Sequence, residues 1–353
     1  MTEDAPIRPP WLDRPYLIAE AGVNHNGDPE LAHKLVDAAH AAGADAVKFQ
    51  TWLPGEQIGR FAAKVAYLEQ AVPGESFFDM GERLRLPFEA FVELKRHCDR
   101  LGIEFLSTAD GQASLDFLVD DLDVPFVKIG STELNHPQYL AAAGAKRRPV
   151  ILSTGLGDLA EVAAAVEVLR AAGGENLPIV VLQCTSEYPA PDDEMNLRAM
   201  CVFASALGLP VGLSDHSRGA EASIAAVAMG GRVIEKHFTL DRNLEGPDHA
   251  ASLEPGELAA LATSVRRVFS MLGDGLKRPT RAERANITGI RRSVVAVRPI
   301  AQGEVLRRED LACKRPGTGI APGDLERVVG LRVNRALEED EPIDWADLRA
   351  CRP

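Results

Sequence analysis

The hydrophobic and polar positions repeat one unit from residue 16 to about residue 273: a short apolar run, a polar or glycine turn, then an amphipathic stretch rich in alanine and leucine. The apolar runs are 16–21, 46–51, 104–108, 126–131, 150–154, 179–185, 211–216 and 233–239. The clearest helical stretches are 29–42, 87–101, 158–172, 219–228 and 255–272. Near-continuous apolar strands that alternate with helices are typical of a parallel sheet covered by helices. Eight such units predict an α/β fold, a (β/α)₈ TIM barrel, and no GxGxxG follows the first strand to favour a dinucleotide-binding sheet.

Two regions depart from the repeat. Residues 52–86, with Tyr67, Glu75, Phe77 and Phe78, lengthen the loop after the second strand. Long loops at this end of a barrel strand lie on the ligand-binding face, so we expect a lid or specificity loop, with a surface excursion of no function as the alternative. Beyond the barrel at 1–275, residues 276–290 are read as a linker, and 291–353 as a small β-rich domain with short strands in SVVAVRPI, QGEVLRREDL and CKRPGTGIAP.

Composition narrows the function classes. The chain has 353 residues, 46% of them hydrophobic, and its net charge is −13 from 39 Lys+Arg against 52 Asp+Glu. This balance argues against nucleic acid or an anionic membrane as the main partner but allows a small anionic substrate. Five scattered cysteines without CxxC spacing predict neither a disulfide framework nor a cysteine zinc site. With a polar N-terminus and no spanning apolar run, we expect a cytoplasmic protein.

Chemically useful side chains gather where the apolar runs end. Those that carry the functional hypothesis are Glu20, Lys48, Gln50, Thr108, Lys128, Ser131, Ser153, Ser214, Asp215, His216, Glu235 and His237. In a barrel the carboxyl ends of the strands surround the active site. Turns account for some polar residues there, but not for two lysines, two histidines and three acids at converging positions. We therefore predict the active site at this end of the barrel.

Two subsets of this ring suggest specific ligands. Lys48 and Lys128, with nearby hydroxyls, are suited to a phosphate or carboxylate, although either lysine alone could be a surface side chain. His216 and His237 end consecutive strands, with Asp215 and Glu235 beside them, and two neutral imidazoles suit a divalent transition metal with open positions. A lone buried histidine is more often a satisfied core residue; the pair favours metal binding. His25 and His249, on the first and last loops, could shape the site.

Longer motifs give a family resemblance. They are IAEAGVNHNGD, AVKFQT, ILSTG, CTSEYPAP, VGLSDHSRG, VIEKHFTLDRNLEGPDHAASLEP and KRPGTGI. Together they closely resemble the sialic acid synthase (N-acetylneuraminate synthase) family, including the legionaminic acid synthases, over about residues 16–343. The resemblance implies a TIM barrel followed by an antifreeze-protein-like (SAF) domain, in a domain-swapped homodimer. It also implies condensation of phosphoenolpyruvate with an N-acylated mannosamine-type sugar (N-acetylmannosamine or 2,4-diacetamido-2,4,6-trideoxymannose), giving a nine-carbon 2-keto sugar acid and phosphate.

The resemblance also implies residue roles. His216 and His237 would bind Mn²⁺, with Co²⁺ or Mg²⁺ as alternatives. Phosphoenolpyruvate would be held by Lys48, Thr108, Lys128, Ser131, Ser153 and Ser214. The sugar would be contacted by Glu20, Gln50, Ser186, Tyr188, Glu235 and Asp248, and its N-acyl group by Arg315 of the partner subunit. The candidate catalytic carboxylates are Glu20, Glu133 and Glu235, and either Glu133 or Glu235 would accept the proton of the water that attacks C2.

The sequence also departs from the family motifs. STPFD is replaced by STADG at 107–111, and PSGE or GSGE by GSTE at 130–133; Ser186 stands where Asn or Thr is common, and Glu75 is nearest to an expected Asn. Two alternatives stay open. A synthase that uses a different or phosphorylated sugar would need an added basic pocket, for which the chain offers only Arg218 and Arg315. A catalytically inactive sugar-binding barrel would be expected to lose a metal histidine or a phosphate lysine, and all four are present.

Overall fold

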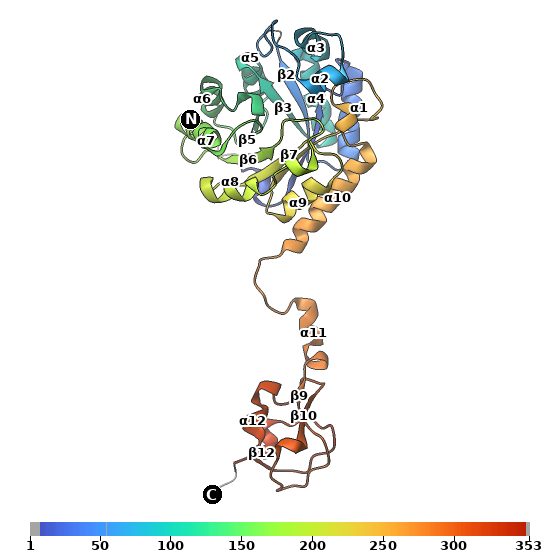
Figure 1. Cartoon of the computed structure of the whole chain (residues 1–353), viewed down its shortest axis with the longest axis vertical. Coiled ribbons are helices and arrows are strands. Elements are labelled where there is room, and N and C mark those ends of the chain that lie inside the picture. The colour runs from blue at the N-terminus through green and yellow to red at the C-terminus, as the bar shows by residue number, and fades with distance from the viewer. Residues whose placement is uncertain (1–7, 54, 351–353) are drawn as a thin grey trace. The chain divides into compact units, whose positions relative to one another are not determined.

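The structure is a computed structural model that describes residues 8–53 and 55–350. By its internal contacts the chain divides into two compact units, one ending at Gly273 and the other beginning at Asp274 (Figure 1). No helix among the described residues is long and apolar enough to cross a bilayer.

The first unit is a closed parallel barrel, which confirms the predicted fold. Within the described residues its strands run in sequence order around the barrel. They are β1 Tyr16–Gly22, β2 Ala46–Trp52, β3 Glu104–Asp110, β4 Val127–Ile129, β5 Val150–Ser153, β6 Ile179–Cys184, β7 Val211–Asp215 and β8 Val233–His237. β4 is shorter than predicted, because Gly130 leads into a 3₁₀ turn at Ser131–Glu133. The fold positions all eight predicted strand ends at one rim.

The strand register aligns the polar ends. Glu20 of β1 pairs with Lys48 of β2 on one side and with His237 of β8 on the other. Thr108 of β3 pairs with Gln50 and with Lys128 of β4. Because side chains alternate along a strand, residues at equivalent register positions face the same side of the sheet. The register therefore brings side chains from distant parts of the sequence to one end of the barrel interior.

Helices cover the outside of the barrel. They are α1 Pro29–Ala41, α4 Phe88–Leu101, α5 Gln112–Asp116, α6 Pro137–Ala145, α7 Leu159–Gly173, α8 Ala199–Leu207, α9 Glu221–Ala228 and α10 Pro255–Leu272. Local signals set their starts: the Asp28 side chain accepts a hydrogen bond from the backbone of Glu30, and Asp158 and Glu161 form a capping box. One apolar cluster lies between strands and helices, and a second fills the barrel interior, including Ile18, Leu106 and Val180. Successive side chains of a strand point alternately into these two apolar clusters, so each strand appears in the sequence as a continuous apolar run.

The insertion after β2 contains two short helices, α2 Ala66–Ala71 and α3 Phe77–Leu84. Leu68, Met80 and Leu84 are buried in a cluster with Val23 and Trp52. Apolar packing therefore anchors the insertion to the ends of β1 and β2, on the rim that the polar side chains share.

The second unit contains α11 Arg281–Ile290, β9 Ser293–Ala296, β10 Leu311–Lys314, α12 Leu325–Val328, β11 Arg332–Val333 and β12 Leu348–Arg349. Among described residues β9 pairs with β10 and β11 with β12, both antiparallel, around a core that includes Val294, Leu306 and Ile343. Most of 276–290, read as a linker, is helical, because Thr280 and Glu283 form a capping box. The prediction of a strand over QGEVLRREDL was wrong, because Gly303 and a 3₁₀ turn at Arg308–Asp310 bend the chain before β10 begins.

Candidate active site

A cavity of about 520 Å³ opens among the carboxyl ends of the barrel strands. Every strand contributes to its lining: Glu20, Lys48, Gln50, Thr108, Asp110, Lys128, Ser153, Cys184, Ser214, Glu235 and His237. Loops add Ser131, Ser186, Tyr188 and His216, and the insertion adds Gln57, Val65, Tyr67, Leu68 and Phe77. The structure thus brings thirteen of the sixteen predicted site residues to one cavity, all but Glu133, Asp248 and Arg315.

Two lysines and two glutamates form the charged floor of this cavity. Lys48 Nζ lies 2.9 Å from Glu20 Oε2 and donates a 2.7 Å hydrogen bond to Thr108 Oγ1. Lys128 Nζ donates to Ser153 Oγ at 2.9 Å and lies 3.6 Å from Glu235 Oε1. All four charged side chains are buried. Buried charges are tolerated when they are paired and hydrogen-bonded, as they are here.

Both glutamates are buried, but their pKa values are shifted in opposite directions. Burial raises the pKa of Glu20 to about 7, against the opposing attraction of Lys48. Burial also disfavours the charged form of Glu235, but Lys128 and Lys48 outweigh it and hold the pKa of Glu235 below its usual value. Burial and the nearby Lys48 charge lower the pKa of Lys128. The floor therefore pairs a fixed carboxylate, Glu235, with a carboxyl that can exchange a proton near neutral pH, Glu20.

The two histidines meet at the same rim, with ring centroids 5.4 Å apart. His216 Nδ1 lies 2.7 Å from the carbonyl oxygen of Thr185, which places the proton on Nδ1. Its Nε2 is contacted by two hydroxyls, Tyr188 OH at 3.1 Å and Ser214 Oγ at 3.4 Å, which a ligand at Nε2 would have to displace. His237 Nδ1 is buried and has no hydrogen-bond partner among the described residues; Asp248 Oδ2 lies 3.7 Å away. Burial, with the His216 charge, keeps the pKa of His237 well below its usual value, so this ring is neutral.

These nitrogens fit a divalent metal with an incomplete protein ligand set. No group of three or more His, Cys, Asp or Glu side chains in the described part of the chain is arranged to hold a metal ion. Asp215, expected beside the histidines, instead faces the outside of the barrel: its carboxylate lies 3.1 Å from Lys236 Nζ and accepts from Ser223 Oγ at 2.6 Å. Side-chain alternation along β7 explains this, since Ser214 takes the inward position. Two imidazoles would leave the other positions to water or substrate.

Aromatic rings connect the insertion to the histidines. Tyr188 stacks on His216 with centroids 4.0 Å apart and meets His237 edge-on at 5.3 Å. Tyr67 of the insertion packs against Tyr188 at 5.1 Å. The insertion therefore forms one wall of the cavity, the position expected of a specificity loop.

Three predicted site residues lie outside the cavity lining. Glu133 pairs with His136 at 2.7 Å, and Asp248 stands behind His237. Arg315 belongs to the second unit, where its Nε donates to the Ile290 carbonyl at 3.0 Å. Glu75, nearest to the expected Asn, is paired with Arg83 at 2.8 Å and does not line the cavity.

Other predicted histidines serve the loops. His25 is buried, accepts a hydrogen bond from the backbone of Gly27 and packs against Phe49. His249 is hydrogen-bonded to Thr239 at 2.7 Å and lies 3.2 Å from Asn26. Both rings therefore brace the first and last loops and do not line the cavity.

Sequence reasoning missed five polar lining residues: Gln57, Asp110, Thr132, Cys184 and Glu187. Strand alternation could have found Asp110, which is two residues after Thr108 and so faces the same side. Cys184 lies where β6 ends, with its Sγ 3.9 Å from His216 Nδ1. Gln57 lies in the insertion, where no periodic pattern marks its direction.

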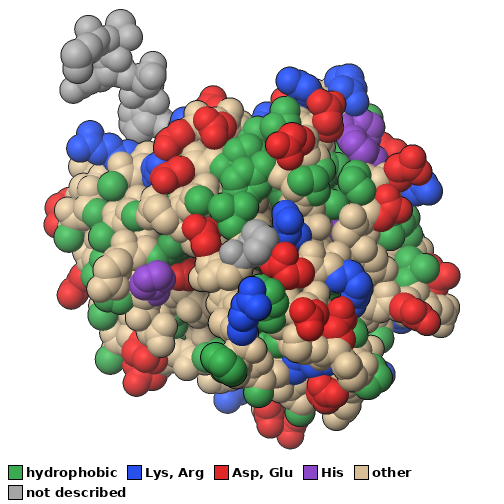
Figure 2. Space-filling view, turned by 90° about the horizontal axis from the view of Figure 1, so that it is seen from above, with side chains coloured by type: hydrophobic (Ala, Val, Ile, Leu, Met, Phe, Trp, Pro, Cys, Tyr) green, Lys and Arg blue, Asp and Glu red, His purple; other side chains and the backbone are tan. Residues whose placement is uncertain are grey.

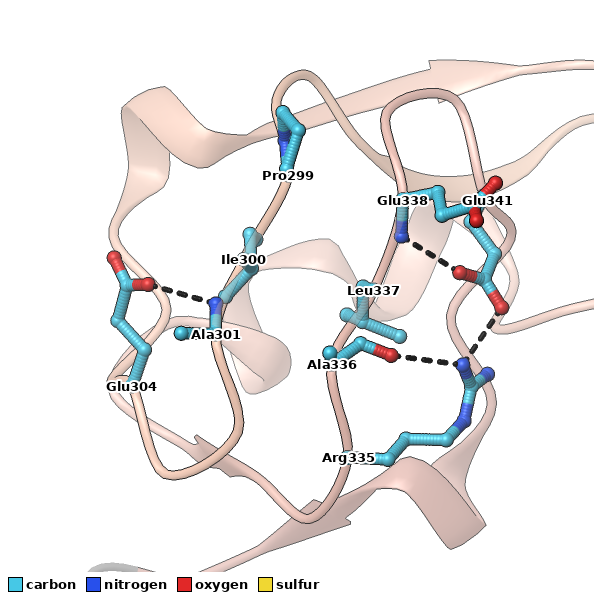
Figure 3. Close-up of a pocket in the computed structure, with 9 residues that line it drawn as sticks. All are labelled: Pro299, Ile300, Ala301, Glu304, Arg335, Ala336, Leu337, Glu338 and Glu341. Atoms are coloured by element: carbon cyan, nitrogen blue, oxygen red, sulfur yellow. Dashed lines mark hydrogen bonds and ion pairs between the residues drawn. The ribbon is translucent and has the colours of Figure 1, made fainter.

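The second unit also has a cavity, but its polar groups are paired with one another (Figure 3). Arg335 donates to Glu341 at 2.7 Å, Glu341 accepts from the backbone of Glu338, and Glu304 accepts from the backbone of Ala301. These contacts tie neighbouring turns together. On the face in Figure 2, Lys and Arg are interspersed with Asp and Glu and form no single basic patch, in keeping with a small-molecule substrate.

Comparison with known proteins gives consistent matches. The NeuB family model matches residues 35–277, and the SAF domain model matches 291–349. A Campylobacter jejuni protein named N,N'-diacetyllegionaminic acid synthase is 43% identical over 94% of this chain and 99% of its own length. A human N-acetylneuraminate-9-phosphate synthase is 34% identical over 93% and 91%. The crystal structure of an N-acetylneuraminic acid synthetase from Leptospira borgpetersenii, in complex with citrate, has a TM-score of 0.68 and 33% identity, covering 78% of this chain and 90% of that one.

Proposed function

The chain belongs to the NeuB family, and we propose from its cavity which acceptor it uses, which residues carry its synthase reaction and how its subunits complete the site. The reaction condenses phosphoenolpyruvate with an amino sugar to give a nonulosonic acid, a nine-carbon 2-keto sugar acid, and phosphate. The observation that carries this function is the buried floor of Lys48, Lys128 and hydroxyl groups beside two imidazoles, of which His237 has an Nδ1 without a hydrogen-bond partner among the described residues. Such a floor can hold an anionic substrate next to a second substrate whose aldehyde group is polarised.

We assign phosphoenolpyruvate to the lysine side of the cavity. Lys48 and Lys128, with the hydroxyls of Thr108, Ser131, Ser153 and Ser214, supply the donors that phosphate and carboxylate oxygens need. Exchange of the internal contacts of these groups for contacts with the substrate would preserve the number of hydrogen bonds. The site would then be ordered before binding, which limits the entropy lost when the substrate arrives.

The acceptor we propose is an unphosphorylated N-acylated sugar, with 2,4-diacetamido-2,4,6-trideoxymannose preferred to N-acetylmannosamine. Among the described lining residues Lys48 and Lys128 are the only Lys or Arg side chains, so no further cation is left for an acceptor phosphate. The wall opposite is apolar, with Val65, Leu68 and Phe77 beside Tyr67. Acetamido methyl groups and a 6-deoxy methyl group suit this wall, whereas a phosphate does not. The 43% identity to the legionaminic acid synthase supports the same choice.

His216 and His237 are the residues that would hold a divalent ion, Mn²⁺ by our proposal, with Co²⁺ or Mg²⁺ as alternatives. When bound there, such an ion supplies Lewis acidity to the aldehyde oxygen of the open-chain sugar. Tyr188 stacks on His216 and its hydroxyl lies 3.1 Å from His216 Nε2, so this hydroxyl would have to move aside or stay next to the ion. Gln50 and Ser186, which line the cavity, are assigned to the orientation of the sugar; Asp248, outside the lining, would act through His237 at 3.7 Å.

The proton steps fall to the two glutamates of the floor. In the reaction C3 of phosphoenolpyruvate bonds to the aldehyde carbon, positive character develops at C2, water adds to C2, and the bond between C2 and the phosphate oxygen breaks. Glu235 is a carboxylate between two lysines, so it can stabilise the charge at C2 and accept the proton of the water. Glu133 is paired with His136 outside the lining, so we favour Glu235 as the base. Glu20, with its pKa near 7, can hold a proton at the sugar oxygen.

The test is product formation from defined substrates. Purified protein is incubated with phosphoenolpyruvate, Mn²⁺ and each of the two acceptors, while phosphate release and the mass of the sugar acid are followed. We expect turnover with both acceptors and a higher kcat/KM for the diacetamido sugar. Chelation should abolish turnover, and Mn²⁺ or Co²⁺ should restore it. Full activity of metal-stripped enzyme would overturn the metal assignment; absence of a sugar acid with either acceptor would favour an inactive binding barrel or a different acceptor.

A His216→Ala variant separates the metal's role in catalysis from any role in folding. Turnover should be lost, while the thermal midpoint should change little, because the barrel core is apolar and does not include this ring. His40→Ala, a change at an exposed position of α1 outside the cavity lining, is the matched control and should keep full turnover.

A further inference from the structure

Asp110, the last residue of β3, lies on the cavity wall and has no role in the assignments above. Along β3 the side chain of Leu106 fills the barrel interior, and Thr108 holds the amino group of Lys48. Two residues further on, Asp110 takes the next position on the same face, nearer to the mouth. The Asp110 carboxyl group is therefore the next side chain on this face of β3 after the contact between Thr108 and Lys48.

The Asp110 carboxyl faces the cavity and has no partner among the described residues. The side chain is 3% exposed and lines the cavity, and no hydrogen bond or ion pair from any described residue ends on its carboxyl oxygens. These oxygens are not among the fully buried side-chain atoms that lack a hydrogen bond, so they open into the cavity and not into the apolar core. Gly130, just after β4, is the neighbouring lining position: a methyl group there would lie 4.0 Å from Asp110 Oδ1, an ordinary contact. A ligand in the cavity can therefore reach this carboxyl group.

The next residue, Gly111, has no room for a side chain of its own. Gly111 has a φ of +111°, and a side chain there would meet Glu56 Oε2 at 2.6 Å. Glu56 of the insertion therefore takes the space beside Gly111, and the carboxyl of Asp110 is one residue earlier, on the cavity face.

We infer that Asp110 is a further substrate-binding residue, placed on the phosphoenolpyruvate side, where its neutral carboxyl donates a hydrogen bond to an anionic oxygen of that substrate. This inference rests on the proposed function. The charged groups that face it are Lys48 on β2, Lys128 on β4, Glu20 on β1 and Glu133 after β4. Burial and Glu133 raise the pKa of Asp110 to about 7, so the neutral donor is present at neutral pH and below. Above that pH the carboxylate would repel the substrate anion.

Two substitutions separate the donor from the charge. Asp110→Ala removes the donor and should raise the KM for phosphoenolpyruvate about tenfold at pH 6, with the acceptor KM unchanged. Asp110→Asn keeps a donor and cannot ionise. It should stay within about threefold of wild type at pH 6 and bind phosphoenolpyruvate more tightly than wild type at pH 8.5. Glu20 also titrates near pH 7, and the substrate phosphate near pH 6. Glu20 and the substrate phosphate still titrate in the Asp110→Asn variant. Only the part of the pH dependence of phosphoenolpyruvate binding that this variant loses therefore belongs to Asp110.

A binding measurement that does not depend on turnover accompanies the kinetics. The rise in thermal midpoint on addition of phosphoenolpyruvate alone should shrink in Asp110→Ala and persist in Asp110→Asn. Asp79→Asn, on the insertion and outside the cavity lining, is the control and should match wild type in every value. An unchanged phosphoenolpyruvate KM and thermal shift in Asp110→Ala, or a change confined to the acceptor KM, overturns the assignment. Wild-type protein that neither binds nor consumes phosphoenolpyruvate would instead overturn the proposed function.

Discussion

At the scale of single residues, the cavity floor places Lys128 where burial and a neighbouring lysine both oppose its charge. Its pKa is lowered for that reason, and Glu235 at 3.6 Å is the principal group that favours the protonated form. An anionic substrate would add a second favourable charge. A bound anion would therefore favour the charged form of Lys128, the behaviour expected of a binding residue.

Lys128→Met tests this placement. The substitution keeps the length of the side chain and removes one charge-assisted contact, a loss of roughly 1.5–3 kcal/mol. The KM for phosphoenolpyruvate should rise, or kcat should fall, by about tenfold to a hundredfold. Lys146→Met, which removes a lysine paired with Asp116 and Asp120 on the outside of the barrel, should leave both constants unchanged. A change in the acceptor KM alone would show that Lys128 serves the sugar.

At the scale of elements, two features shape the cavity around the histidines. The ends of β7 and β8 are joined by a buried pair, Asp215 and Lys236, whose charged atoms are 3.1 Å apart. Each of these residues directly precedes a site histidine, His216 or His237. On the opposite side, α2 of the insertion brings Tyr67 onto Tyr188. The ion pair between Asp215 and Lys236 holds together the strand ends that carry the histidines, and the insertion supplies another wall of the cavity.

Lys236→Met should weaken the link between the ends of β7 and β8, because it removes the cation of the Asp215–Lys236 ion pair. It leaves Asp215 buried without its cation, and loss of one partner of a buried ion pair costs about 3–5 kcal/mol. We expect a clear fall in the free energy of unfolding, together with weaker Mn²⁺ affinity measured by titration of the folded protein. The double variant Asp215→Asn/Lys236→Met should regain part of the stability, because no uncompensated charge remains. Equal metal affinity in wild type and folded Lys236→Met would limit the pair to a structural role.

Tyr67→Ala tests the insertion. Loss of an aromatic ring from the wall should raise the acceptor KM by about threefold to tenfold, the range that one aromatic contact supplies, without a change in the phosphoenolpyruvate KM. Phe61→Ala is the matched control, since Phe61 belongs to the same insertion and its side chain is fully exposed. If both variants change the acceptor KM equally, the effect comes from the insertion as a whole and not from the contact with Tyr188.

At the scale of the whole molecule, the question is which barrel Arg315 serves. It is carried by the second unit, in the turn that follows β10, and α11 separates it from the barrel along the chain. We propose that it completes the site of a partner subunit in a domain-swapped homodimer. A site shared in this way would make activity a property of the dimer.

Complementation tests the shared site. Arg315→Ala and His216→Ala homodimers should both be inactive, whereas a mixed dimer keeps one site with an intact barrel and an intact arginine. Co-refolding at equal ratio should recover roughly a quarter of wild-type activity, because half of the dimers are mixed and each has one complete site of two. Two different affinity tags verify that mixed dimers form. Verified mixed dimers without activity would place Arg315 at the barrel of its own chain, or exclude the swap.

The sequence alone determined the barrel, its strand order and most of the cavity residues. Near-continuous apolar runs that alternate with amphipathic helices can be buried in few ways, and the ends of parallel strands in a barrel must converge, so Lys48, Lys128, His216 and His237 could be assigned to one site without coordinates. Tertiary structure decided what partner each side chain meets. Asp215 turned to Lys236, Glu133 to His136 and Glu75 to Arg83, while Gln57 entered the cavity. These outcomes depend on strand phase and on loop paths set by long-range packing, which local patterns of residue type do not encode.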